Sequence, residues 1–118
     1  MNVQLVATKF DLTPELEKYA RAKMAQLMHK VPRQWRTGVV CVVAFSQARK
    51  KGSEFNSCSI SFTVSGTELK AEETTLHMYS SLDIAAVHIA NQLKGYADQN
   101  GGRHIRGILH TYVHRLAR

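Results

Sequence analysis

The residues of this chain that could do chemistry are few, and the best spaced are two histidines. His110 and His114 stand four apart, which on a helix puts two imidazoles on one face at the spacing of metal ligands. No third ligand and no His-Glu-x-x-His motif accompanies them, and polar surface histidines are the commoner interpretation of such a pair. The paired acids Glu72 and Glu73 are interpreted as surface charge, and the chain has no P-loop, dinucleotide fingerprint or nucleophile elbow. The sequence therefore predicts no catalytic residues, bound metal, cofactor or small-molecule substrate, and a metal-dependent enzyme would rest on the two histidines alone.

Two cysteines, Cys41 and Cys58, are too far apart to form a C-x-x-C motif. The first ten residues lack a basic stretch followed by an apolar one, so we expect no secretory signal. The expected location is cytoplasmic, with an organelle matrix as the alternative, and thiols stay reduced there. Both cysteines are therefore predicted to be buried free thiols. The longest apolar run, residues 39–45, is too short to span a membrane, so we expect no membrane partner.

Positive charge is the strongest functional signal. Sixteen lysines and arginines stand against nine acids, giving a formal net charge of +7, and the sequence pI is about 9.7. A domain this basic favours binding to nucleic-acid phosphates, with an affinity that falls as salt rises. The candidate RNA-binding residues are Lys23, Lys30, Arg33, Arg49, Lys50, Lys51, Lys94, Arg103 and Arg106. An ordinary solvated surface is the alternative for any single lysine, and residues 49–51 fit RNA contact and a plain exposed loop equally well.

Hydrophobic periodicity predicts the elements that must position these residues. Thr13 can cap a helix that Pro14 opens, and apolar residues then recur in steps of three and four until Pro32 stops them. Alternating or continuous apolar residues indicate four strands. We predict strands at residues 3–7, 39–44, 58–64 and 68–72, helices at 14–31 and 79–98, a polar loop or hairpin tip at 46–54, and a short helix within 103–118.

The resulting order, β-α-β-β-β-α plus a tail, predicts an α+β fold. Strands flanked by helices favour a four-stranded, mostly antiparallel sheet with two helices on one face and a C-terminal helical tail. Residues 1–99 would form one domain and residues 100–118 a basic amphipathic tail, because Asn100-Gly101-Gly102 breaks the second helix. The serines and threonines of residues 59–65 would face solvent. A face without aromatic residues favours backbone recognition of structured RNA over single-strand recognition.

The chain also resembles a known family from residue 1 to about residue 98. An apolar-alternating strand leads into Phe10-Asp11-Leu12-Thr13 and a helix with Leu16, Ala22-Lys23 and Leu27. Later come Gly66-Thr67-Glu68-Leu69-Lys70-Ala71-Glu72, Met78-Tyr79, Leu82-Asp83 and Gln92-Leu93. In order and spacing these segments resemble the ribosome hibernation-promoting factor and ribosome-associated inhibitor family, also called sigma-factor modulation proteins.

This resemblance implies a non-enzymatic protein that binds the small ribosomal subunit and its rRNA. It implies that the protein occupies the mRNA and tRNA channel, inhibits translation and promotes ribosome hibernation under stress or in stationary phase. Lys23 matches a basic position of the family, whereas His77 replaces its usual capping Asp and leaves Thr75 as a candidate cap. His88, Asn91 and Gly95 stand where the family's second helix is rich in Lys and Arg. Residues 49–51 and the tail are therefore candidates to supply the missing charge.

Two other functions fit the sequence. A protein-interaction regulator would self-associate through the apolar side of the tail, formed by Ile105, Ile108, Leu109, Tyr112 and Leu116. Truncation at Gly101 would abolish that association, whereas a tail packed on its own domain predicts a monomer. An RNA-binding ribosome maturation factor would instead bind assembling subunits. The absence of a long C-terminal extension disfavours the self-dimerising long form of the resembled family.

Overall fold

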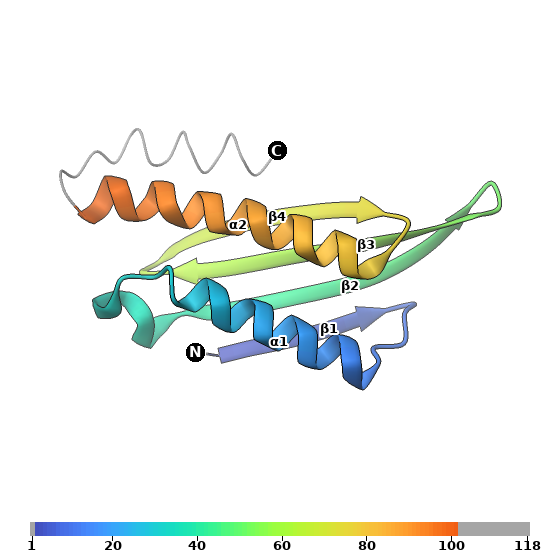
Figure 1. Cartoon of the computed structure of the whole chain (residues 1–118), viewed down its shortest axis with the longest axis horizontal. Coiled ribbons are helices and arrows are strands. Elements are labelled where there is room, and N and C mark those ends of the chain that lie inside the picture. Colours follow the sequence, from blue (N-terminus) through green and yellow to red (C-terminus); the bar gives the residue numbers. More distant parts are fainter. Residues whose placement is uncertain (1, 102–118) are drawn as a thin grey trace.

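The computed structural model describes residues 2–101, which form one sheet and two long helices (Figure 1). The elements are β1 (Asn2–Thr8), α1 (Pro14–Met28), the 3₁₀-helix η1 (Arg33–Gly38), β2 (Val40–Lys50), β3 (Ser53–Val64), β4 (Thr67–Thr75) and α2 (Met78–Gly101). The predicted α+β fold and its β-α-β-β-β-α order are confirmed. The predicted tail helix, with Arg103, Arg106, His110 and His114, lies outside the described residues, so the domain boundary at residue 99 stays a prediction.

The sheet has the strand order β1-β2-β3-β4. β1 pairs in parallel with β2 because α1 carries the chain back between them, and the other two pairs are antiparallel. Two-residue turns close both hairpins, and each has positive φ at both residues: 51° and 80° at Lys51 and Gly52, 52° and 82° at Ser65 and Gly66. Turns of this kind match the natural twist of antiparallel strands. The sheet is therefore mostly antiparallel, as predicted.

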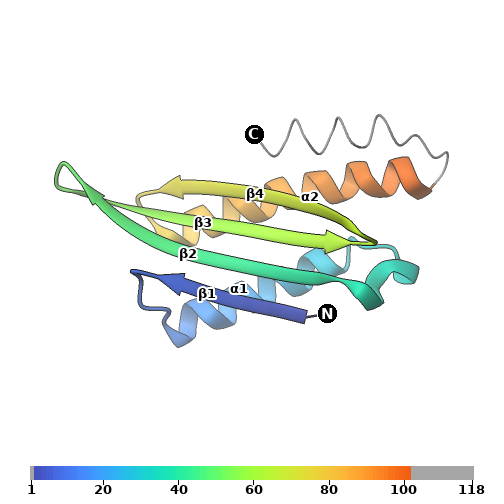
Figure 2. The same cartoon turned by 180° about the vertical axis from the view of Figure 1, so that it is seen from behind.

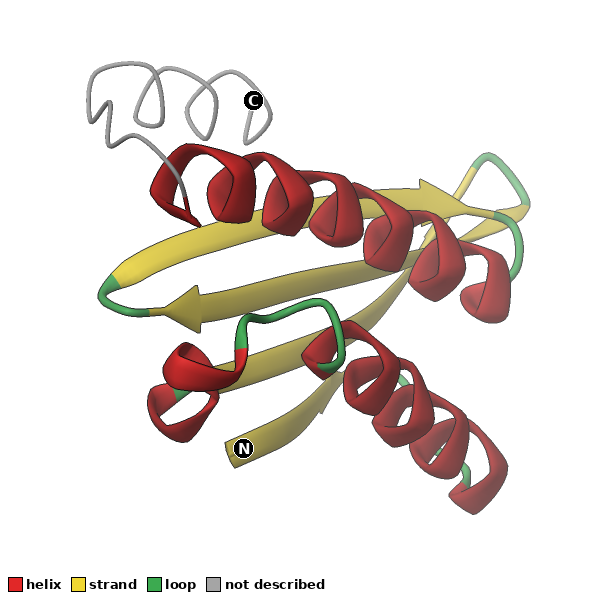
Figure 3. Ribbon diagram, turned by 60° about the vertical axis from the view of Figure 1, so that its left-hand side comes forward, coloured by secondary structure: helices red, strands yellow, loops and turns green. Residues whose placement is uncertain are grey.

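Both helices cover one face of the sheet and leave the other face open (Figures 2 and 3). Along β3, Cys58, Ile60 and Phe62 are fully buried beneath the helices, while the serines and threonines between them stay partly exposed on the open face. This alternation is the predicted half-buried strand. The helices complete the core with Leu16, Ala20, Met24 and Leu27 from α1, and Leu82, Ala85, Ala86, Ile89 and Leu93 from α2.

Local signals in the sequence fix the two ends of α1. The Thr13 hydroxyl accepts a hydrogen bond from the Leu16 backbone N–H at 3.1 Å, Pro14 is the first helical residue, and acids occupy the first turn. The helix ends at Met28, three residues earlier than predicted. Residues 29–31 make tighter i→i+3 bonds before Pro32, and Val31 is buried in that turn.

Polar side chains join the start of α2 to β3 and β4. Thr75, the candidate cap, bonds no backbone N–H within α2. Its hydroxyl accepts instead from the backbone N–H of His77, just before the helix, at 3.1 Å, and it contacts the Ser81 hydroxyl at 2.8 Å. Ser81 Oγ donates to the Asn56 carbonyl at 2.6 Å, and Asn56 Nδ2 donates to the Leu76 carbonyl at 3.0 Å. Further along, Gln92 Nε2 donates to the Lys70 carbonyl at 2.7 Å. These bonds hold α2 along the sheet edge formed by β4.

Of the two alternatives predicted for residues 46–54, a polar loop or a hairpin tip, the structure shows the hairpin, with strands that run much further than predicted. β2 and β3 continue as a paired ribbon to Lys50 and from Ser53, so only Lys51 and Gly52 form the turn. The ribbon projects beyond the helices, where both of its faces meet water (Figure 1). Backbone pairing maintains it there, and side-chain hydropathy carries no strand signal when neither face is buried.

The segment between α1 and β2 also has regular structure. Arg33–Gly38 forms η1, and Trp35 packs edge-on against Tyr96 of α2 with ring centres 5.2 Å apart. Arg36 Nε donates to the Val31 carbonyl at 2.9 Å. This segment therefore closes the end of the core between α1 and α2.

Candidate nucleic-acid interface

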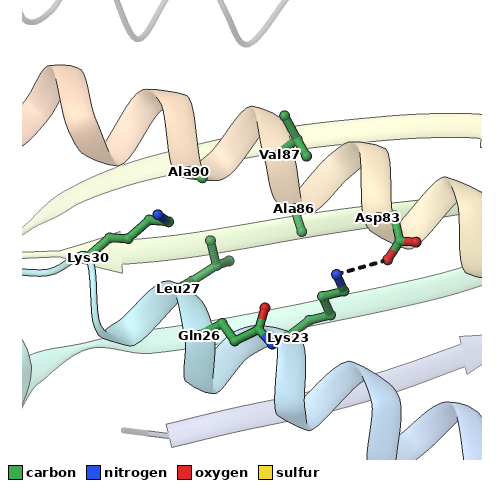
Figure 4. A pocket seen from close by; sticks show the side chains of 8 residues that line it. All are labelled: Lys23, Gln26, Leu27, Lys30, Asp83, Ala86, Val87 and Ala90. Carbon is green, nitrogen blue, oxygen red and sulfur yellow. Dashed lines mark ion pairs between the residues drawn. The ribbon is translucent and has the colours of Figure 1, made fainter.

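A shallow groove separates α1 from α2 on the helix-covered face (Figure 4). It encloses about 160 Å³ and is lined by Lys23, Gln26, Leu27, Lys30, Asp83, Ala86, Val87 and Ala90. The α1 wall carries both lysines, and the α2 wall carries one acid and small or apolar residues. Two of the predicted RNA-binding residues, Lys23 and Lys30, therefore share one open concave surface.

Lys23 is joined to α2 by an ion pair. Its Nζ lies 3.3 Å from Asp83 Oδ1, and the Tyr19 hydroxyl donates to the same oxygen at 2.8 Å. Burial alone would lower the pKa of Lys23, but the hydrogen bond and charge of Asp83 outweigh it and raise that pKa. The hydrogen bond to Asp83 is likewise the main reason that the pKa of Tyr19 is raised. Lys23 is thus held as a fixed cation at the groove, with its Nζ 5.4 Å from the centre of the Tyr19 ring.

The other groove cations lie toward the end of the molecule that η1 closes. Lys30 follows α1 and is exposed, with its side chain directed across the groove toward α2 (Figure 4). Arg33 opens η1 and is exposed. Lys94 is exposed on α2, and its position four residues after Ala90 and seven after Val87 puts it on the groove side of that helix. Helical periodicity thus extends the groove's positive charge from Lys23 toward Lys94.

The structure separates the hairpin cations from this groove. Arg49 and Lys50 end β2 and Lys51 lies in the turn, so all three stand at the tip of the projecting ribbon (Figure 1). The tip and η1 lie at opposite ends of a molecule whose longest extent is 50 Å. Arg49 is partly neutralised by Glu54 directly across the ribbon, at 3.6 Å. The predicted residues therefore form two separate basic regions.

Sequence reasoning missed the acids within these basic regions. Asp83 and Glu54 each pair with a predicted RNA-binding residue, so neither basic region consists of cations alone. The partner of Arg49 could have been found from the hairpin register once Lys51-Gly52 was identified as the turn. The partner of Lys23 lies 60 residues away on another helix, and no local pattern reveals it.

Little else in residues 2–101 has the arrangement of a chemical site. No group of three or more histidine, cysteine, aspartate and glutamate side chains there could hold a metal ion. Cys41 and Cys58 are buried free thiols, as predicted, and burial raises the pKa of each to about 12. They are thus kept protonated and away from solvent. None of the helices in the described range is long and apolar enough to cross a membrane.

Comparisons with known proteins agree with this architecture. Residues 3–100 match the family described as Sigma 54 modulation protein / S30EA ribosomal protein. No curated protein matches the chain. The crystal structure of the Thermus thermophilus Protein Y N-terminal domain is similar with a TM-score of 0.69 and 21% identity, over 81% of this chain and 99% of that one. A ribosomal subunit interface protein from Coxiella burnetii gives a TM-score of 0.66 and 18% identity, over 83% of this chain and 99% of that one. At these identities the two structures show a shared fold.

Proposed function

The chain belongs to the Sigma 54 modulation protein / S30EA ribosomal protein family, and on that premise we propose that it is a non-enzymatic ribosome-binding factor. It binds rRNA of the small ribosomal subunit and occupies the channel that mRNA and tRNA use. Translation is inhibited by steric occupancy, and idle ribosomes are preserved in stationary phase or under stress. The factor acts in the cytoplasm. The Coxiella burnetii neighbour is a ribosomal subunit interface protein, which supports binding to the ribosome.

The observation that carries this proposal is the open groove with lysines on its α1 wall. Lys23 is fixed by Asp83, and Lys30 extends from the neighbouring turn. The opposite wall includes Ala86 and Ala90, whose small side chains leave room for a sugar-phosphate backbone to approach. Phosphates carry most of the affinity of proteins for structured RNA, which presents few base edges to a protein surface. A fixed cation beside an open groove suits that mode of recognition.

Co-sedimentation with purified vacant ribosomes and isolated small subunits tests the proposal. At low salt we expect the protein to migrate with both particles, and at high salt to return to the top of the gradient, because counterion release weakens phosphate contacts. Added to a cell-free translation reaction, the same protein should reduce synthesis. Protein that stays at the top of the gradient even at low salt would overturn the proposal.

Charge reversal of Lys30 tests the groove itself. We expect Lys30→Glu to weaken ribosome binding about tenfold or more and to lower the salt slope by about one, as for the loss of one phosphate contact. The matched control is Lys70→Glu, which changes another exposed lysine, on the open face of the sheet, and should bind like the wild type. Equal losses from the two variants would show that net charge, and not the groove, drives binding.

The hairpin tip is a second contact that the proposal includes. Reversing Arg49, Lys50 and Lys51 to glutamate should weaken ribosome binding by about as much as two phosphate contacts contribute, since Arg49 is already paired with Glu54. The swap Arg49→Glu with Glu54→Arg keeps both the net charge and the pair, so it serves as the control. Unchanged binding of the triple variant would rule the tip out as a contact.

A further inference from the structure

Phe55 is an aromatic residue whose position the core does not explain. It is partly exposed, lies outside the core cluster, and makes no contact with a second ring in the part of the chain that the structure describes. Every other aromatic ring in residues 2–101 is buried in the core or packs on a second ring; these are Phe10, Tyr19, Trp35, Phe45, Phe62, Tyr79 and Tyr96. The Phe55 ring is therefore available to a binding partner.

Strand periodicity places Phe55 on the open side of the ribbon formed by β2 and β3. Asn56 and Cys58 are buried beneath the helices, so Phe55 and Ser57 face the opposite side. β1 ends opposite Ser46 and β4 ends opposite Asn56. Phe55 thus lies one residue beyond both edge strands, where the sheet narrows to the projecting ribbon (Figure 1).

The neighbours of Phe55 on this side are small, with one exception. Ala48 lies directly across the ribbon, and Ser53 and Ser57 are the next residues of β3 on the same side. Lys50 is diagonal to Phe55 and is the one long side chain among them. Alanine and serine side chains are too short to cover a phenyl ring. Phe55 therefore presents an uncovered aromatic surface beside a cation.

Polar side chains anchor the base of the ribbon to the rest of the fold. Gln47 Nε2 donates to Asn56 Oδ1 at 2.7 Å, and Asn56 Nδ2 donates to the Leu76 carbonyl at 3.0 Å. Backbone pairing then continues outward to Lys50 and Ser53. A surface that is held in place before binding loses less conformational freedom when a partner arrives, which favours affinity.

We propose that Phe55 stacks on an unpaired nucleobase of the small-subunit rRNA while Lys50 contacts a neighbouring phosphate. This inference rests on the proposed function and adds a base contact to the phosphate contacts of the groove and the tip. Bases within an RNA helix are stacked on one another, whereas unpaired bases can stack on aromatic side chains. Every base has a flat face, so the contact selects single-stranded RNA without reading a sequence.

Charge favours RNA over a protein as the occupant of this surface. Residues 47–55 carry three cations and one acid, a net charge of +2, in Arg49, Lys50, Lys51 and Glu54. Arg49 pairs with Glu54 at 3.6 Å, on the side of the ribbon opposite to Phe55. Lys50 and Lys51 are exposed next to the ring, and a sugar-phosphate backbone supplies the negative charge that both attract.

A series of substitutions at Phe55 tests the proposal in the full chain, by co-sedimentation with vacant small subunits. Phe55→Ala should bind about tenfold more weakly than the wild type, as for the loss of one base stack. Phe55→Leu, which keeps an apolar side chain without a flat ring, should also bind more weakly, and Phe55→Trp should bind like the wild type. Wild-type binding by Phe55→Leu would point to an ordinary hydrophobic contact with a protein and would overturn the proposal.

A valine on the open side of the sheet supplies the matched control. Val6→Ala also shortens an exposed apolar side chain, 45% exposed on β1, and should bind like the wild type. Losses of equal size from Val6→Ala and Phe55→Ala would contradict a specific contact at Phe55.

Acylation of rRNA 2′-hydroxyls shows whether a base is held. The reagent modifies flexible, unpaired nucleotides, so the bound wild type should lower the reactivity of a nucleotide that is unpaired in the vacant subunit. At a concentration that saturates the subunits, Phe55→Ala should restore that reactivity and leave the other protections in place. The same pattern for the two proteins would overturn the proposal.

The outcomes separate this inference from the proposed function. A wild type that does not sediment with the subunits overturns both, whereas a wild type that binds no better than Phe55→Ala overturns this inference and leaves the proposed function standing. The urea unfolding midpoint of Phe55→Ala should equal that of the wild type, because Phe55 lies outside the core. A large fall in that midpoint would mean that the ring is required for folding, which contradicts its availability to a base.

Discussion

The two helices that line the groove contribute to the core in the same way, but their groove-facing side chains differ. α1 and α2 each bury one apolar side on the same face of the sheet. Toward the groove, α1 presents Lys23, Gln26 and Lys30, whereas α2 presents Asp83, Ala86, Val87 and Ala90. The difference teaches that burial constrains only the inner side of each helix. The outer sides can therefore differ in chemistry, and the proposed function uses the cations on the α1 side of the groove.

The largest effect is expected where the α1 wall meets the core. Leu27 is almost fully buried at the floor of the groove, and Leu27→Ala should lower the free energy of unfolding by about 2–5 kcal/mol through lost burial and the cavity left behind. Gln26→Ala, one position earlier and exposed, should change it by about 0.5 kcal/mol or less. Chemical denaturation of both variants measures the difference, and similar losses would mean that the groove floor is not part of the core.

Removing the acid from the α2 wall should make the two walls more alike. Asp83→Asn removes the negative charge that pairs with Lys23 and leaves the Tyr19 hydroxyl a neutral, weaker acceptor, so the free energy of unfolding should fall by about 1 kcal/mol, a figure kept small because both paired groups are partly exposed. Ribosome binding should instead strengthen about two- to threefold, because a negative charge near the bound phosphates is lost. Denaturation and co-sedimentation measure the two changes.

A control variant separates these two effects. Glu68→Gln removes an acid from the open face of the sheet, where it accepts a hydrogen bond from Ser61, and should not change ribosome binding. If Asp83→Asn weakened binding, the role of Asp83 would be to hold Lys23 in position for the phosphate, and the ion pair would count as part of the interface.

Elements with a buried face could be predicted from the hydropathy of the sequence, whereas strands exposed on both faces could not. The order of elements and the covered face of the sheet follow from periods of two and 3.6 residues, and the cap at Thr13 follows from its residue type before Pro14. Residues 46–54 were predicted as a loop or a hairpin tip, and the length of their paired strands was missed because residues 48–54 are exposed and their strands need no apolar alternation. The one local sign of this hairpin is Gly52, which favours the positive-φ turn that it forms with Lys51.

The residues of the candidate site could be predicted from their type, but which of them lie together in the groove could not. Lys23 and Lys30 could be named as cations from the sequence, and their spacing of seven puts them on one side of the helix predicted at residues 14–31. That this side faces α2 and meets Asp83 depends on how two helices pack across 60 residues of chain. The packing of α1 against α2 depends on the sheet that both helices cover, and the sequence alone gives no local sign of it.

The smallest expected effect is a change in the pKa of Tyr19, which reports on the hydrogen bond between Tyr19 and Asp83 across the groove. The pKa of Tyr19 is raised above its ordinary value of 10.0, chiefly because its hydroxyl donates to Asp83. A phenol that holds its proton more tightly when folded stabilises the fold, fully so below pH 10, and that contribution is lost as pH rises through the folded pKa. Ultraviolet titration of the phenolate should therefore show one tyrosine ionising later than the others.

Variants assign that transition and test its cause. Tyr19→Phe should remove the late transition, and Asp83→Asn should move it down toward pH 10. Because Tyr19 lies on α1 and Asp83 on α2, the shift measures whether the walls stay joined in solution. A late transition that persists unchanged in Asp83→Asn would mean that Asp83 does not raise the pKa of Tyr19, and that the contact between α1 and α2 is not made in solution.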